Sequence, residues 1–332
     1  MDSLTQIILG AAVGEATLGR KIGNKAMLYG AIAGTIPDLD VLVSLFTNTV
    51  TALEIHRGFT HSVFFSIVFA PIFAFIVIKY ETYKNFKKWT SLFFLAFITH
   101  PILDAQTTWG TQLFWPLDIR LAFKNVFVVD PLYTIPFLVF LILAMRQKKE
   151  AKKRRLYNYL GLIISSSYLV LTLILKGVSY QKFTQELSKQ NIQYKAIKTK
   201  PTPLNTILWS ANVETENYYL IGYSSFLDKN AITFSEYPKN HELLGDLANH
   251  PKVKRMIAIS KGWYTINKNE NNLYFNDLRF GLLSLQPNAT NFVFKYKIEI
   301  ASDGNLFFIE EPKEKRDGKK LLSDLWNRIK GN

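Results

Sequence analysis

The stretch from Ser62 to Ile78, SVFFSIVFAPIFAFIVI, contains no charged side chain. A helix that crosses a membrane needs about 20 consecutive, mainly apolar residues. Because no ionisable group interrupts this run, it predicts a helix in lipid. Pro71 within it is compatible with that interpretation, since neighbouring membrane helices can satisfy the backbone groups that a proline leaves free.

Apolar runs of similar character lie on both sides of this stretch. We expect about six membrane segments, at residues 4–18, 26–46, 62–78, 89–107, 131–145 and 157–175. The first is short and contains Glu15, so we expect either a full crossing or a re-entrant helix. Residues 1–6 lack the positive region of a cleavable signal, so we expect this segment to remain in the mature protein.

The apolar character of the chain is concentrated in its first half. The overall hydrophobic content is 48%, but residues from about 177 onward are mixed and polar. There, aromatic and β-branched runs bounded by Asn, Asp and Gly predict strands, at 217–223, 272–275 and 291–300. The predicted fold is therefore an α-helical membrane bundle, residues 1–178, followed by a soluble, mainly-β domain, residues 179–332.

The end of the chain shows helical periodicity. Apolar residues recur at helical spacing among charged ones; they are Leu321, Leu322, Leu325, Trp326 and Ile329. This pattern predicts a short amphipathic helix. It is compatible with a helix on a membrane surface and with one packed on its own domain.

The net charge of +14 reflects clustered basic loops. The densest basic run, 146–155, lies between two apolar segments, where membrane topology explains it better than nucleic-acid binding. Basic loops at 20–25, 79–88 and 146–155 should be cytoplasmic, which places the loops at 47–61 and 108–130 and the C-terminal half outside. We expect membrane lipids as partners and no nucleic acid; the sequence does not indicate an oligomeric state.

Ionisable residues gather at the outer ends of the predicted segments. Such residues are costly in a membrane and therefore indicate function. The candidates are Asp38, Asp40, His56, Arg57, His61, His100, Asp104, Asp118, Arg120 and Asp130. Asp118 follows a proline as turn residues do, and Asp130 before Pro131 resembles a helix N-cap.

The spacing of four of these residues is typical of metal ligands. His100 and Asp104 are four apart, so on a helix both extend from one face, about 5–6 Å apart at Cβ. Gly58 interrupts the backbone between His56 and His61, so both imidazoles can turn toward the same centre. The chain has no cysteine, so the ligands are imidazole and carboxylate, which suit zinc first and manganese or iron as alternatives.

Three further residues are predicted to act on a substrate. Pro37 disrupts the helix before Asp38 and Asp40, so that one or both serve as a further ligand or general base. Arg57 is expected to orient an anionic group. A divalent metal lowers the pKa of bound water, which favours hydrolysis. The candidate ligands exceed three plus water, so the site holds two metals or one with supporting partners.

Three alternatives use the same residues differently. They could form a satisfied polar network between helices. They could form the ion site or proton relay of a transporter, although Glu15 is then the sole candidate toward the cytoplasmic side. The chain could also be a non-catalytic membrane scaffold whose β-rich half binds a partner.

The motifs resemble a known family. The matching stretches are MDSLTQ at 1–6, LGAAVGE at 9–15, PDLD at 37–40, HRGFTHS at 56–62, HPILD at 100–104 and FWP at 114–116. They resemble the membrane-bound metal-dependent hydrolases, also described as LexA-binding, inner-membrane-associated hydrolases. The resemblance covers about residues 1–180. It implies a bacterial inner-membrane hydrolase that binds metal through its His and Asp motifs. Our first hypothesis is that such an enzyme acts at the outer face of the membrane on a lipid-linked or envelope substrate.

Overall fold

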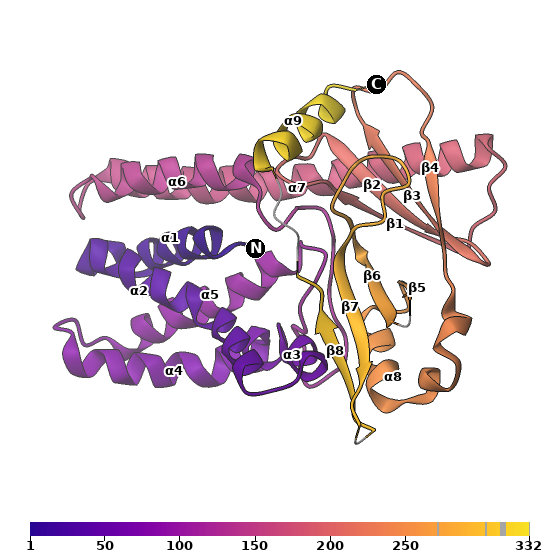
Figure 1. Ribbon diagram of the computed structural model, residues 1–332. Coiled ribbons are helices and arrows are strands. Elements are labelled where there is room, and N and C mark those ends of the chain that lie inside the picture. Colours follow the sequence, from indigo (N-terminus) through magenta and orange to yellow (C-terminus); the bar gives the residue numbers. More distant parts are fainter. Residues whose placement is uncertain (271, 303, 313–316, 332) are drawn as a thin grey trace. The chain divides into compact units, whose positions relative to one another are not determined.

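The computed structural model describes residues 1–270, 272–302, 304–312 and 317–331 (Figure 1). The chain divides into two compact units. The first comprises Met1–Val43, Ile55–Ile174 and Pro203–Asn205; the second comprises Ser44–Glu54, Leu175–Thr202 and Thr206–Asn332. The chain passes from the helical unit to the β-rich one within helix α7 (Lys152–Lys189).

The first unit is helical. Its main helices are α1 (Ser3–Ile22), α2 (Asn24–Thr35), α4 (Val63–Tyr80), α5 (Phe86–Asp104), α6 (Pro131–Met145) and the first part of α7, with the 3-10 helices η1 (Pro37–Leu45) and η2 (Phe59–His61) between them. Side-chain caps fix where they begin: the Ser62 hydroxyl accepts from Phe65 N, and Asp130 accepts from Leu132 N and Tyr133 N. The predicted N-cap at Asp130, with Pro131 in the first turn, is confirmed.

The described residues include fewer long apolar helices than the sequence suggested. Two are long and apolar enough to cross a membrane, α4 and α7. A third is added if α2 and η1, which meet at a 43° bend, form one broken span. The expectation of six membrane segments is thus not supported. Polar residues lower the mean hydropathy of α1 and α5. Helix α6 has 15 residues, or about 22 Å of helix, which is shorter than the roughly 30 Å hydrocarbon core of a membrane.

Helices α1 and α2 pack through glycines. A Cβ atom on Gly10 would lie 2.2 Å from the carbonyl oxygen of Gly30, and one on Gly14 would lie 2.0 Å from that of Ala26. One on Gly34 would lie 2.7 Å from the carbonyl oxygen of Gln6. Because these neighbours are backbone atoms, any side chain would push the helices apart. Small residues four apart allow this close approach in membrane helices.

The second unit contains two antiparallel four-stranded sheets. The first is formed by β1 (Ala196–Pro201), β2 (Leu208–Glu214), β3 (Tyr218–Ser225) and β4 (Phe234–Pro238); the second is formed by β5 (Tyr264–Asn269), β6 (Asn272–Leu282), β7 (Phe292–Ile300) and β8 (Leu306–Glu310). In each sheet the strands pair in chain order. The β-rich character predicted for this half is confirmed.

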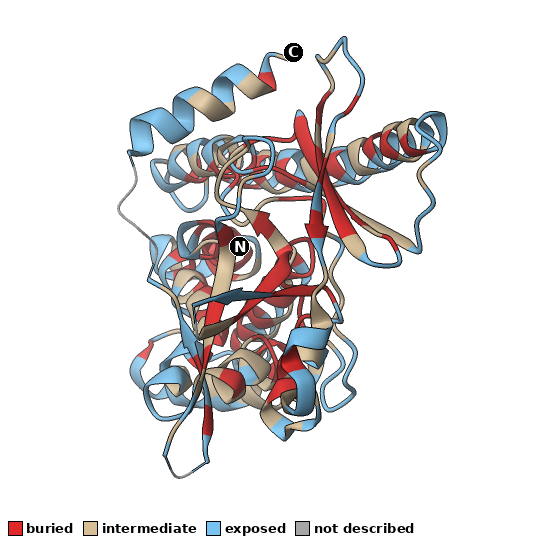
Figure 2. Ribbon diagram, turned by 45° about the vertical axis from the view of Figure 1, so that its right-hand side comes forward, coloured by how far each residue is buried: buried red, intermediate tan, exposed pale blue. Residues whose placement is uncertain are grey.

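Short helices complete the second unit. Helix α3 (Thr49–Ile55) contributes Val50 to a core with Leu244 and Met256 of η3 (His241–Asn249) and α8 (Pro251–Ile259). Helix α9 (Gly318–Ile329) is exposed along most of its length (Figure 2). Its last turn is held by an ion pair between Arg328 and Asp228, with an N–O distance of 2.6 Å.

The glycine contact between α1 and α2 makes a direct prediction. Gly14→Ala should lower the free energy of unfolding by about 1–3 kcal/mol, because the added methyl overpacks a backbone contact. Gly177→Ala is the matched control, since a Cβ there meets nothing within 4 Å and alanine favours the helix. Thermal unfolding of the purified protein in detergent measures both. Equal midpoints for the two variants would contradict the packing.

Candidate metal centre

Four acidic and imidazole side chains converge at one end of the helical unit. They come from three elements: Asp38 from η1, His61 from η2, and His100 and Asp104 from the last turns of α5. Each offers one ligand atom, and the four atoms lie within 4.8 Å of one another. This donor set, built from imidazole and carboxylate, could hold a metal ion.

The distances from the two imidazole nitrogens to the other ligand atoms are close to those of tetrahedral coordination. Nε2 of His61 lies 3.2 Å from Nε2 of His100 and 3.3 Å from both Asp38 Oδ1 and Asp104 Oδ2. Nε2 of His100 lies 3.4 Å from Asp38 Oδ1 and 3.5 Å from Asp104 Oδ2. Ligands about 2.0–2.1 Å from a tetrahedral zinc are separated by about 3.3–3.4 Å. The two imidazole nitrogens therefore lie at distances from each other and from both carboxylates that would suit ligands of one ion.

Hydrogen bonds on the far side of the imidazoles aim their free nitrogens inward. Nδ1 of His100 lies 2.7 Å from the carbonyl oxygen of Gly34, and because a carbonyl only accepts, Nδ1 donates. The neutral ring then presents a lone pair at Nε2. Asp104 Oδ2 also forms no hydrogen bond with any described group. Lone pairs facing one another in a buried space are stabilised by a cation.

Asp40 supports the site from outside the set of four. Its Oδ2 accepts from the backbone N of Arg57 at 2.7 Å and lies 3.5 Å from Nδ1 of His61. Its Oδ1 lies 3.0 Å from Nδ1 of His56. A carboxylate behind a ligating imidazole fixes the ring and raises its basicity. Asp40 thus orients His61 toward the other three ligand atoms.

The carboxylate of Asp104 is fully buried and contacts several polar groups. Its Oδ1 accepts from Nε2 of Gln6 at 3.0 Å and contacts the amino group of Met1. Nε of Arg57 lies 3.0 Å from Oδ2, and the same guanidinium donates to Thr107 Oγ1 at 2.9 Å. These neighbours compensate the cost of burying the carboxylate.

The structure arranges the predicted site residues differently from the sequence interpretation. His56, predicted as a ligand, lies outside the group of four; its ring contacts Asp40 and lies 5.5 Å from Trp109. Asp38, predicted as a ligand or base, supplies the fourth ligand atom. Arg57, predicted to orient substrate, is buried against Asp104, with a φ of 58°.

Two supporting groups were missed from the sequence. Gln6 is a polar residue in an apolar segment, a signal that could have marked it as a partner. The carbonyl of Gly34 carries no sequence signal, because its role depends on the close approach of backbone and imidazole.

Two further candidates from the sequence lie outside the group of four ligand residues. Asp118 accepts a hydrogen bond from Gln112, and Arg120 donates one to the carbonyl of His56.

The cluster is open on one side. The side chains of His61, His100 and Asp104 are 0–1% exposed, whereas that of Asp38 is 26% exposed. Asp38 is therefore the member of the cluster that solvent contacts. The exposed carboxylate belongs to η1, the segment after the bend at the end of α2.

Apolar helices that carry a buried cluster of imidazoles and carboxylates, joined to a β-rich half, define a membrane protein with a candidate metal centre. The family model of the YdjM inner membrane protein matches residues 1–179. This is more than half of the 332 residues, and the chain belongs to that family. The family supports a location in the inner membrane.

Two curated relatives are similar to part of the chain. An uncharacterized protein of Bacillus subtilis (strain 168), YfhP, is 31% identical over 151 residues, covering 42% of this chain and 44% of the relative. The inner membrane protein YbcI of Escherichia coli (strain K12) is 32% identical over 99 residues, covering 30% of this chain and 57% of the relative. The chain thus spans about half the length of each. No solved structure matches it.

The metal centre is tested by replacing single ligands. Purified protein should bind about one equivalent of zinc, and His100→Ala should bind it at least about 100-fold more weakly, because one of four ligands is lost. His56→Ala is the matched control, since His56 offers no atom to the group of four although its ring lies edge-on to that of His61, and we expect a loss below about 10-fold. Zinc titration against a competing chelator measures both. If His56→Ala lost as much affinity as His100→Ala, the assignment of the four ligands would be wrong.

Proposed function

We propose that this chain is a metal-dependent hydrolase of the cytoplasmic membrane that cleaves an ester or phosphoester of a lipid-linked or envelope substrate. The observation that carries the proposal is the convergence of Asp38, His61, His100 and Asp104, whose ligand atoms lie within 4.8 Å of one another, with Asp38 as the partly exposed member. Structural metal sites are closed, whereas catalytic ones keep a position open. Zinc fits the donor set first, with manganese or iron as alternatives.

The residues of the chain have separate tasks in this proposal. A divalent cation would supply Lewis acidity, which makes water nucleophilic near neutral pH. Asp38, at the exposed side, is placed to accept a proton from that water or to bind the ion. Asp40 keeps Nε2 of His61 turned inward, and Arg57 keeps the buried Asp104 carboxylate charged.

Apolar surface beside Asp38 supports a lipid-linked substrate. Leu39, Val41 and Leu42 of η1 are 55%, 51% and 51% exposed. An apolar surface around a polar entrance suits a molecule with a hydrocarbon anchor and a polar group to be cleaved. A freely soluble substrate would gain nothing from these side chains.

The position of Glu15 favours an enzyme over a proton-coupled transporter. A relay needs ionisable groups that continue from the metal centre toward the other membrane face. Glu15 is the candidate in α1, but both of its oxygens accept from Arg154, at 2.6 and 2.5 Å. A carboxylate whose two oxygens are both occupied by one guanidinium is poorly placed to pass protons along a relay.

Topology within the helical unit supports a site on the outer face. In α1, Gln6 lies at the metal centre and Arg20 lies at the opposite end, in a basic loop region. In α5, His100 lies at the metal centre and Lys88 lies at the opposite, basic end. Because basic loops remain cytoplasmic, the metal centre would open outward. The chain would cross the membrane several times, with its C-terminal half on the outer side.

Activity should depend on the ion and on the open ligand. In protein reconstituted with lipids, we expect hydrolysis of at least one member of a panel of lipid esters and phosphoesters. A chelator should abolish it and zinc or manganese restore it, and Asp38→Asn should lower kcat at least about 100-fold. Gly177→Ala, remote from the cluster, should keep full activity. Turnover that survives complete metal removal would exclude the proposed mechanism.

The orientation is tested with introduced cysteines, because the natural chain has none. Lys229→Cys in the β-rich half should react with a membrane-impermeant maleimide in cells whose inner membrane is intact. Lys148→Cys in the basic loop should react only after that membrane is permeabilised. Both positions are exposed, so the reversed pattern would place the metal centre on the cytoplasmic face.

A further inference from the structure

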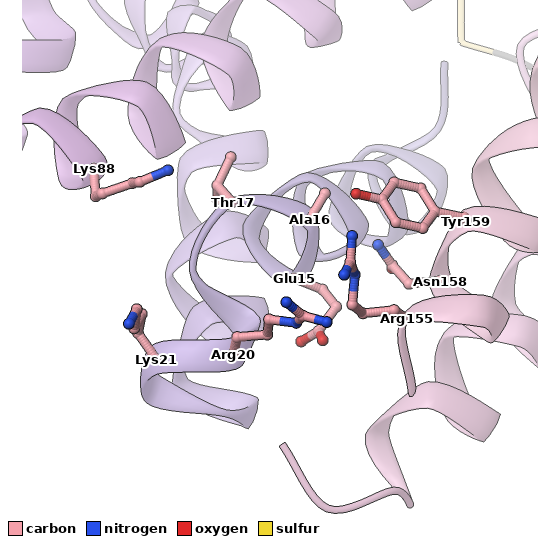
Figure 3. A pocket seen from close by; sticks show the side chains of 9 residues that line it. All are labelled: Glu15, Ala16, Thr17, Arg20, Lys21, Lys88, Arg155, Asn158 and Tyr159. Carbon is pink, nitrogen blue, oxygen red and sulfur yellow. The ribbon is translucent and has the colours of Figure 1, made fainter. Parts of the chain in front are cut away.

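A basic pocket lies in the helical unit, away from the metal centre. It has a volume of about 220 Å³ and is formed by the C-terminal part of α1 and the first turns of α5 and α7. Its lining residues are Glu15, Ala16, Thr17, Arg20, Lys21, Lys88, Arg155, Asn158 and Tyr159 (Figure 3). On α5, Lys88 precedes His100 by twelve positions, which separates the two sites by about 18 Å along the helix.

Four of the lining side chains are cations without an acidic partner among the described residues: Arg20, Lys21, Lys88 and Arg155. The one lining carboxylate, Glu15, is already neutralised by Arg154 behind it. In Figure 3 the guanidinium groups of Arg20 and Arg155 turn toward the same space near Glu15. The pocket therefore has a strong excess of positive charge, which favours an anion.

Neutral polar groups beside the cations favour a ligand that carries hydroxyl groups as well as negative charge. Asn158 is buried; its Nδ2 donates to the carbonyl of Ala12 at 3.0 Å, and its Oδ1 has no hydrogen bond with a described group. The hydroxyl of Tyr159 faces the pocket (Figure 3). An unpaired acceptor cannot bind a phosphate oxygen, but it can accept from a hydroxyl group. A phosphate that carries hydroxyls satisfies both kinds of lining group.

The surroundings of the pocket indicate a lipid as the source of this phosphate. Helix α7 is a candidate membrane span. Because residues four apart lie on one face of a helix, this face of α7 carries Arg155, Tyr159 and Ile163. Tyr159 and Ile163 are exposed. This apolar stripe leads from the pocket along the span, where acyl chains attached to a bound headgroup would lie.

We infer that this pocket binds the phosphate headgroup of an anionic phospholipid, with a polyhydroxyl headgroup such as glycerol preferred. Arg20 and Arg155 hold the phosphate, since a guanidinium binds phosphate oxygens in a bidentate manner. Lys21 and Lys88 add charge at the rim, and Asn158 accepts from the headgroup hydroxyl. This site is independent of the proposed hydrolase activity, because none of its residues contributes to the metal centre.

Lipid retention by the full-length protein tests the inference. Native mass spectrometry of detergent-solubilised protein would compare phosphatidylglycerol, phosphatidylcholine and added inorganic phosphate. Wild type should retain phosphatidylglycerol in preference to phosphatidylcholine. Arg20→Gln combined with Arg155→Gln should weaken that binding by about 30-fold, the loss expected for two cations near a lipid phosphate.

Matched variants separate this pocket from general surface charge. Lys152→Gln combined with Lys153→Gln removes the same charge from the same turn of α7, outside the pocket, and should change binding less than about 2-fold. If the arginine pair fails to fold by circular dichroism, Lys21→Gln combined with Lys88→Gln at the rim replaces it, with a smaller but measurable loss expected.

Three outcomes would overturn the inference. Equal loss in the control pair would mean that the lipid responds to diffuse charge. Equal retention of phosphatidylcholine would remove the role of the net negative charge. Displacement of the lipid by millimolar inorganic phosphate would identify a free-phosphate site instead of a headgroup site.

Discussion

The buried carboxylate of Asp104 is the constraint on which the helical unit depends. Its side chain is fully shielded from solvent, and an unpaired buried charge costs several kcal/mol. Helix α1 supplies Gln6, the loop after α3 supplies Arg57, η2 supplies His61, and α5 itself supplies His100. Segments that are distant in the sequence are thus brought to one point by the need to compensate one charge.

The close packing of α1 on α2 also helps to position the groups around Asp104. Because Gly10, Gly14 and Gly34 bring the two backbones together, the end of α2 reaches α5 closely enough for the carbonyl of Gly34 to accept from His100. The bend that follows turns η1 so that Asp38 faces both imidazoles. A larger side chain in this contact would therefore alter the spacing of the ligands as well as the stability of the helix pair.

The sequence predicted those features that local rules determine. The spacing of His100 and Asp104 on a helix correctly placed both at one centre, and hydropathy correctly separated a helical half from a β-rich one. It failed where the backbone is irregular. Asp38 lies within the 3-10 helix η1, and His56 precedes Arg57, a residue with positive φ. The directions of these two side chains could therefore not be inferred from residue spacing. Apolar runs also overstated the membrane segments, because α1 and α5 carry the polar residues that build the two sites.

The opposite ends of α1 and α5 now have a common physical explanation. At one end carboxylates outnumber cations: Asp38, Asp40 and Asp104 face the guanidinium of Arg57 and the amino group of Met1. At the other end Arg20, Lys21, Lys88 and Arg155 face one carboxylate that Arg154 already neutralises. Buried carboxylates in a low-dielectric setting need counter-charges, whereas the four cations are exposed and repel one another across one pocket. A divalent cation would relieve the first imbalance and a lipid phosphate the second, so one pair of helices would be stabilised at both ends by ligands of opposite sign.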